Sequence, residues 1–247
     1  MGADEPASPS TGEGLDWVEP REIATWCAII ITMQNQWVGD DGDILKLGLL
    51  RHLVQLCGDA VNPLGVNWYM ATPKPRESPT PPDQVLLDRL SELRAAPRRT
   101  VADLQGSGLL GDAKFFNVPV PPKSKRKAWH QQARTALAGC PAVFLDPDNG
   151  VQPGCGNRRH VLWRELKCWW ENGARTVIVF QHARREPDVA ARIAESINTQ
   201  LGAASTLEPI RRKNRWMYVI PPSATRERAT IEEAVFTFRE RWKEWLG

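Results

Sequence analysis

The chain has 247 residues, of which 42% are hydrophobic and 25% charged, and its formal net charge is +3 at pH 7. This length accommodates one sizeable α/β domain or two small ones, and the composition is that of a globular protein. No apolar run approaches the roughly 20 residues needed to cross a bilayer, which excludes an integral membrane protein built from helices.

The N-terminal segment Met1–Gly14 is acidic and rich in Pro, Ser and Gly, and it lacks the basic and apolar regions of a signal peptide. We therefore expect residues 1–18 to form a disordered tail, residues 19–247 to form a single domain, and the protein to be cytoplasmic. The five cysteines include no Cys-x-x-Cys pair, which argues against a disulfide framework and against a structural zinc site.

Apolar periodicity and turn residues predict alternating strands and helices along the chain. The expected strands are 28–32, 64–71, 114–120, 142–145, 176–182, 206–210 and 215–220, and the expected helices are 43–56, 82–95, 100–105, 125–138, 160–171, 187–201 and 231–246. Asp43 is the expected N-cap of the first helix. The proline-rich run 73–82 is expected to be a surface loop, and whether it closes over a ligand is left open.

This alternation predicts a doubly wound α/β fold with a mainly parallel sheet and helices on both faces. The eleven tryptophans include Trp163, Trp169 and Trp170 in one segment and Trp242 and Trp245 in another. Their spacing of three and four residues is more typical of core packing than of base stacking.

The most informative stretch is Ala142–Gly150, where an apolar strand stops at Asp146-Pro147-Asp148-Asn149. Ligands of open α/β sheets bind outside the carboxyl ends of strands, so Asp146 is a candidate to accept a proton or a hydrogen bond from a substrate nitrogen. Asp148 and Asn149 add polar groups, and Gly150 permits the close approach of another group. A tight structural turn explains the same residues equally well.

A second candidate site is the loop Gly39-Asp40-Asp41-Gly42-Asp43, which leads directly into the first helix. Asp43 and Lys46, three residues apart, lie on one face of that helix. The clustered carboxylates suit a divalent cation, ribose hydroxyls or an amine. The structural alternative is a capped turn with a solvated lysine.

His182 ends the strand expected beside Ala142–Leu145, and Arg184 follows it closely. Further basic clusters include Arg158 and Arg159. Such clusters suit a phosphate backbone, although solvated loops explain any single one. Several clusters near the proposed strand ends favour an anionic partner, with Arg158, Arg159, His182 and Arg184 as candidate substrate-binding residues.

These residues resemble a family. Asp43 and Lys46 fall on the Asp and Lys of the Asn-x-Ala-Asp-Val-Leu-Lys-His motif of bacterial ribosomal-RNA adenine-N6 methyltransferases, with Leu47 in place of its His. The catalytic Asp-Pro-Pro-Tyr of those enzymes also follows an apolar strand, as Asp146-Pro147-Asp148-Asn149 does here. The chain thus resembles a branch that has Asp-Pro-Asp-Asn-Gly in place of Asp-Pro-Pro-Tyr.

The resemblance implies a class I, Rossmann-type methyltransferase fold and S-adenosylmethionine as cofactor. It places the cofactor near Gly39, Asp40, Asp43 and Lys46, and it places Asp146, Asp148 and Asn149 beside the methyl-accepting atom. The implied substrate is nucleic acid or a nucleotide-containing molecule. Asn149 stands where the family has the aromatic ring that stacks on a flipped adenine, so the accepting atom stays open.

Two alternatives remain. Pro147-Asp148 followed by Glu165-Leu166-Lys167 spells the pattern of Mg²⁺-dependent nucleases, in which two carboxylates hold the metal and the lysine activates water. Those enzymes need Glu-x-Lys on a strand, whereas the spacing around Glu165 is helical. The other alternative is an inactive protein of the same fold that binds nucleic acid or protein through its basic loops.

Overall fold

The fold was established from a computed structural model of the chain. The structure describes residues 41–69, 82–95, 101–147, 149–152, 158–171, 174–182, 189–202 and 206–247. The expected tail at 1–18, the expected strand at 28–32 and most of the expected loop at 73–82 lie outside these residues.

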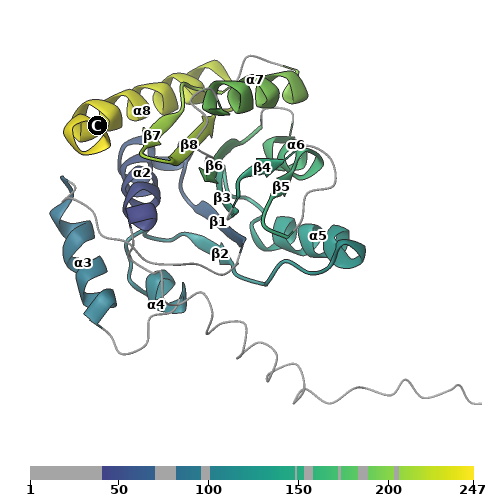
Figure 1. Cartoon of the computed structure of the whole chain (residues 1–247), viewed down its shortest axis with the longest axis horizontal. Coiled ribbons are helices and arrows are strands. Elements are labelled where there is room, and N and C mark those ends of the chain that lie inside the picture. The colour runs from purple at the N-terminus through teal and green to yellow at the C-terminus, as the bar shows by residue number, and fades with distance from the viewer. Residues whose placement is uncertain are drawn as a thin grey trace, which may run out of the picture.

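A six-stranded sheet of order β2-β1-β3-β6-β8-β7 forms the centre of the protein (Figure 1). Its strands are β1 (Leu64–Tyr69), β2 (Lys114–Phe116), β3 (Ala142–Pro147), β6 (Thr176–His182), β7 (Ile210–Arg212) and β8 (Arg215–Ile220). The first four are parallel, and β8 is antiparallel to both β6 and β7. The expected mainly parallel sheet is confirmed. Beside it, β4 (Val151–Gln152) and β5 (Val161–Leu162) form a short parallel pair.

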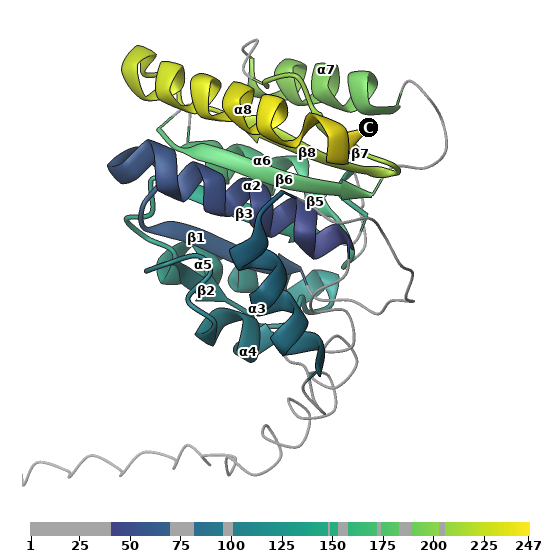
Figure 2. The ribbon, with the colours of Figure 1, turned by 90° about the vertical axis from the view of Figure 1, so that its left-hand side faces the viewer.

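Seven α-helices are described, and they cover both faces of the sheet (Figures 1 and 2). They are α2 (Asp41–Cys57), α3 (Gln84–Ala95), α4 (Val101–Gly106), α5 (Arg126–Ala136), α6 (Trp163–Trp170), α7 (Val189–Leu201) and α8 (Thr225–Leu246). Because side chains alternate along a strand, Phe144 packs in the core under α2 and α8, whereas Val143 and Leu145 pack in the core under α5, α6 and α7. Among the described residues, no helix is long and apolar enough to cross a membrane.

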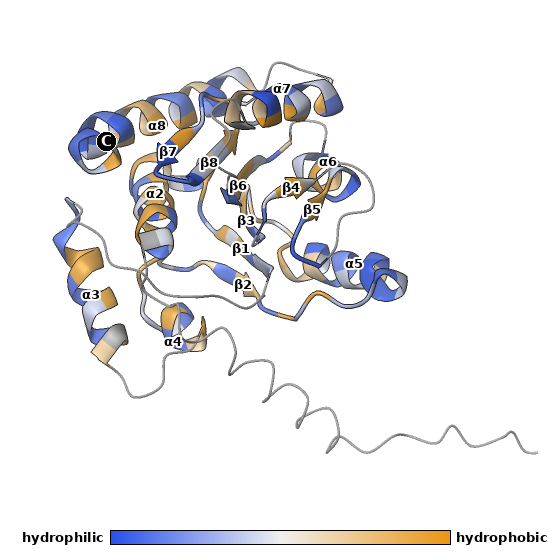
Figure 3. Cartoon of the chain, viewed as in Figure 1, coloured by the Kyte–Doolittle hydropathy of each residue, from blue (hydrophilic) through white to orange (hydrophobic). Residues whose placement is uncertain are grey.

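Helix α2 packs closely on α8 because a glycine leaves room for an indole. Gly48 of α2 lies directly against the ring of Trp242, and a Cβ at this position would overlap that ring. Phe238 stacks on Trp242 with ring centroids 4.8 Å apart. Trp242, Trp245, Trp169 and Trp170 are all buried, as the helical spacing predicts, whereas Trp163 is half-buried. In Figure 3 the ribbon of α2 is coloured largely as hydrophobic, whereas that of α5 is coloured mainly as hydrophilic.

Several element boundaries differ from the sequence prediction. Asp43 is not the N-cap of its helix, because α2 already includes Asp41 and Asp43 therefore lies in the first turn. Strand β2 ends at Phe116, before Pro119 and its missing N–H. Helix α6 begins at Trp163 because the two preceding residues pair with β4 instead. The prediction of a strand at 206–210 was wrong in its bounds, because β7 begins only at Ile210 and ends at Arg212.

The order of the strands creates a switch point between β1 and β3. From this boundary the chain builds outward, to β2 on one side and to β6 on the other. The connections that leave β1 and β3 therefore diverge, and in open α/β sheets this opens a crevice at the carboxyl ends of the two strands. These ends are Tyr69 and Pro147. The sequence-predicted Asp146 lies at the carboxyl end of β3, beside this switch point.

Candidate functional site

Asp146 occupies the carboxyl end of β3 on the face covered by α2. Val143, Phe144 and Leu145 are fully buried, and the strand thus carries the aspartate to the rim of the core. Asp146 lies opposite Trp68 of β1 in the sheet register. Its side chain is 13% exposed, so the carboxylate is recessed but reachable from solvent.

Lys46 joins the two sequence motifs, which are 100 residues apart. Its ammonium lies 2.8 Å from Oδ1 of Asp146 and donates a 2.9 Å hydrogen bond to Oδ2. The same ammonium lies 3.5 Å from Oδ1 of Asp43, one helical turn earlier. The predicted juxtaposition of Asp43 and Lys46 on one helix face is confirmed, and α2 delivers both to the end of β3. The side chains of Asp43 and Lys46 are each 12% exposed.

Strand β6 adds two aromatic rings to this group. The ammonium of Lys46 lies 4.3 Å from the centroid of the Phe180 ring, within range of a cation–π interaction. His182, two residues later on the same face, meets Phe180 edge to face at 5.9 Å and is exposed. Asp43, Lys46 and Asp146 together carry two negative charges and one positive charge.

Gln181, which the sequence analysis did not single out, fixes the loop after Asp146. Its Oε1 accepts a 2.9 Å hydrogen bond from the Val151 N–H, and its Nε2 donates to the Asn149 carbonyl at 2.8 Å and the His182 carbonyl at 3.0 Å. Gly150 has φ +80°, and a Cβ there would overlap the Gln181 amide. The expected close approach at Gly150 is confirmed, and the approaching group is this amide.

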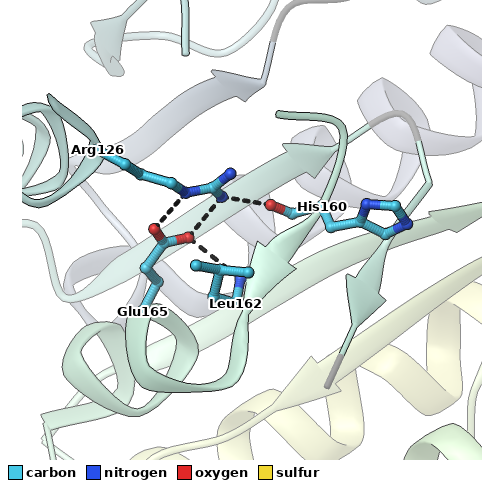
Figure 4. A network of polar contacts seen from close by, with 4 residues as sticks. All are labelled: Arg126, His160, Leu162 and Glu165. Carbon is cyan, nitrogen blue, oxygen red and sulfur yellow. Dashed lines mark hydrogen bonds and ion pairs between the residues drawn. The ribbon is translucent and has the colours of Figure 1, made fainter. Parts of the chain in front are cut away.

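A second polar group lies on the opposite face of the sheet, between α5 and α6 (Figure 4). Arg126 Nε lies 2.6 Å from Glu165 Oε1, Arg126 Nη2 donates to Oε2 at 2.8 Å, and the guanidinium also donates to the His160 carbonyl. Glu165 in turn accepts a 3.1 Å hydrogen bond from the Leu162 N–H. Both side chains of the pair are almost completely buried. Arg126 and Glu165 therefore hold α5 against the start of α6.

Burial near this pair changes the pKa of two more groups. Burial lowers the pKa of His130 to about 4, with the nearby Glu165 carboxylate acting in the opposite direction. Burial also raises the pKa of Tyr69 well above its ordinary value, and the negative charge of Glu165 adds to this rise. The Trp169 indole acts in the opposite direction on the pKa of Tyr69. Within the described part of the chain, neither the Tyr69 hydroxyl nor the Trp169 N–H has a hydrogen-bond partner. Both side chains are therefore neutral at pH 7.

The remaining candidates lie at several places. Asn149, Arg158 and Arg159 are exposed at the carboxyl edge of the sheet, and the Asn149 N–H donates to the Arg159 carbonyl at 2.9 Å. Glu165 and Lys167 lie on helix α6, as their spacing predicts, and not on a strand. Gly39, Asp40, Asp148 and Arg184 lie outside the described residues. Within the described ranges, no group of three or more His, Cys, Asp or Glu side chains is arranged to hold a metal ion.

Comparison with protein-family models, curated proteins and solved structures found no match to this chain.

Proposed function

We propose that this protein is a class I methyltransferase-like enzyme that transfers a methyl group from S-adenosylmethionine to nucleic acid or to a nucleotide-containing substrate. The observation that carries the proposal is the contact between Lys46 and Asp146. It joins the two motifs on which the family resemblance depends, and it lies at the switch point between β1 and β3, where open α/β sheets bind nucleotides.

The charges of the site fit this cofactor. S-Adenosylmethionine carries a positive sulfonium, a positive amino group and a negative carboxylate, and the site offers groups of both signs, the carboxylates of Asp43 and Asp146 and the ammonium of Lys46. The cofactor supplies an electrophilic methyl group when bound. Asp43 and Lys46, in the first turns of α2, are the residues proposed to hold its polar groups, together with Gly39 and Asp40 of the preceding loop.

The proposed role of Asp146 is to orient the acceptor. Its carboxylate accepts a hydrogen bond from the acceptor nitrogen and thereby directs the nitrogen lone pair toward the methyl group. The proton released on methylation passes to this carboxylate or to solvent. Asn149, attached to β6 through Gln181, and Asp148 are proposed to position the rest of the acceptor ring.

The two alternatives make different demands on the same residues. A nuclease centre needs a Glu165 carboxylate that is available to a metal, whereas both of its oxygens contact Arg126 and one also accepts from the Leu162 N–H. No contact in the described part of the chain favours that centre. An inactive binding protein of the same fold differs from the proposed enzyme in one measurable respect, which is methyl transfer.

The test is calorimetric titration with S-adenosylmethionine, followed by transfer of its labelled methyl group to RNA, DNA and nucleotides. We expect the wild type to bind the cofactor and Asp146→Asn to lose transfer with little change in melting temperature. Asp112→Asn is the matched control, because this exposed aspartate lies just before the amino end of β2. Absence of cofactor binding, with and without nucleic acid, would refute the proposal.

A further inference from the structure

The region around α5 and α6 has an unusual charge distribution. Between Asp112 and Asp146 the sequence contains six basic residues and no acidic residue. Between Asp148 and Glu165 it contains three arginines and again no acidic residue. These two segments therefore carry nine positive charges, although the net charge of the whole chain is only +3.

The buried pair of Arg126 and Glu165 brings the two segments together (Figure 4). Arg126 begins α5 between Lys125 and Lys127, and its guanidinium donates to the carbonyl of His160, the residue after Arg159. The lysines around the start of α5 and the arginines around the start of α6 therefore lie at two neighbouring helix starts. We define the basic surface by five of these side chains: Lys123, Lys125, Lys127, Arg158 and Arg164.

All five side chains of the basic surface are exposed, and none has an ion-pair partner within the described residues. Some half-buried cations elsewhere have carboxylate partners, as in Arg228 with Glu232 and Arg239 with Glu208. Uncompensated cations repel one another, so an unpaired group of five costs stability unless an anionic partner offsets it. The basic surface therefore has the character of a binding surface.

The basic surface adjoins the candidate site. The Asn149 N–H donates to the Arg159 carbonyl at 2.9 Å, which connects the arginine turn directly to the loop that follows Asp146. The guanidinium of Arg126 also lies 6.0 Å from the ring of Tyr69, the last residue of β1. A polymer bound on the basic surface therefore lies beside the loop that follows Asp146.

A second basic segment flanks the site on its other side. The segment from Arg211 to Arg215 includes the end of β7, the turn at Lys213 and Asn214 and the start of β8, and Arg215 lies opposite His182 in the sheet register. In this segment Arg211 is exposed, and its guanidinium lies 5.0 Å from the Trp216 ring. Positive charge therefore extends along the carboxyl edge of the sheet on both sides of Asp146.

From this arrangement we infer that the basic surface and the segment from Arg211 to Arg215 bind the phosphate backbone of a single-stranded nucleic acid. Cations on both sides of the site suit a polymer that carries a charge on every unit. The inference of a single strand rests on the proposed function, because the recessed Asp146 carboxylate is accessible only to a base that is not stacked in a duplex.

The test is the fluorescence anisotropy of labelled 20-nucleotide RNA and DNA strands of one mixed sequence, titrated with the full chain at several salt concentrations. We expect a plot of log affinity against log salt concentration with a slope of about −4, since each phosphate contact on a single strand contributes about −0.7 and the basic surface and Arg211 together supply six exposed cations. The variant K123Q/K125Q/K127Q should flatten the slope by about 2 and weaken binding by more than about tenfold. Binding of RNA, of DNA or of both supports the inference.

The matched control is R226Q/R241Q/K243Q, which removes three exposed cations of α8, a helix that also carries five glutamates. An equal loss of affinity in this control, a salt-independent affinity, or equally tight binding of duplex or of polyglutamate would overturn the inference. Cofactor titration of K123Q/K125Q/K127Q separates the two proposals. If the wild type does not bind S-adenosylmethionine but binds the strands as described, the proposed function fails and backbone binding stands.

Discussion

Replacement of Gly150 by alanine is expected to destabilise the fold by about 4 kcal/mol through two separate effects. Alanine at φ +80° costs about 1 kcal/mol in the backbone. The new Cβ also displaces the Gln181 amide, which makes hydrogen bonds to Val151, Asn149 and His182. Loss of these three bonds, of which the bond from Val151 is buried and the other two are partly buried, costs about 1 kcal/mol each.

The assay is urea denaturation of Gly150→Ala, Gln181→Ala and the double variant. Gln181→Ala loses the same three hydrogen bonds and should cost about 3 kcal/mol. In the double variant the alanine Cβ no longer overlaps the Gln181 amide. The loss in free energy of unfolding should therefore stay at about 4 kcal/mol, far below the additive value of about 7 kcal/mol. Gly111→Ala is the control, because Gly111 has φ +58° and open space around its Cα, and it should lose only about 1 kcal/mol. Additive losses in the double variant would refute the proposed contact.

Three further outcomes are expected. Arg126→Met and Glu165→Gln should each cost about 3–5 kcal/mol in urea denaturation, because each leaves a buried charge without its partner, and a loss below about 1 kcal/mol would contradict the burial of the pair. The pKa of His130 is lowered from 6.5 to about 4 by burial, so the unfolded chain takes up this proton first and stability should fall as pH decreases from about 6.5 to 4. His130→Gln should flatten that fall, and unfolding curves at pH 7, 5.5 and 4.5 measure it. In the native protein the exposed Cys168 should react with a thiol reagent before the buried Cys57, whose pKa burial raises to about 11, and peptide mass spectrometry gives the order.

Much of the fold could be predicted because local signals and the final structure agree. The β-branched run of β6 and the helical apolar spacing of α2 specify their elements without help from distant residues. One boundary that failed depends on a distant partner instead. Val161 and Leu162 form a strand only because β4 pairs with them, and the helical pattern of the following residues conceals this.

The site could be predicted only in part, for the same reason. Asp43, Lys46 and Asp146 carry chemistry in their types and spacing, and the strand order brings them together. Gln181 carried no such signal, because a glutamine near the end of a strand has no special meaning in the sequence. Its role depends on the contact of its amide with Gly150, which only the structure shows. The buried position of Arg126 was equally hidden, because its neighbours in the sequence are exposed lysines and the cluster looks solvated throughout.

The distances in the site separate the roles of its two carboxylates under the proposed function. Asp146 contacts the Lys46 ammonium at 2.8 Å, whereas Asp43 lies 3.5 Å from it. The closer contact fixes Asp146 in one orientation, which suits a residue that directs an acceptor, and the longer contact costs less to exchange for a cationic group of the cofactor. Asp43→Asn should therefore weaken cofactor binding in calorimetry, while Asp146→Asn should reduce methyl transfer far more than cofactor affinity. The reverse pattern would exchange the two roles.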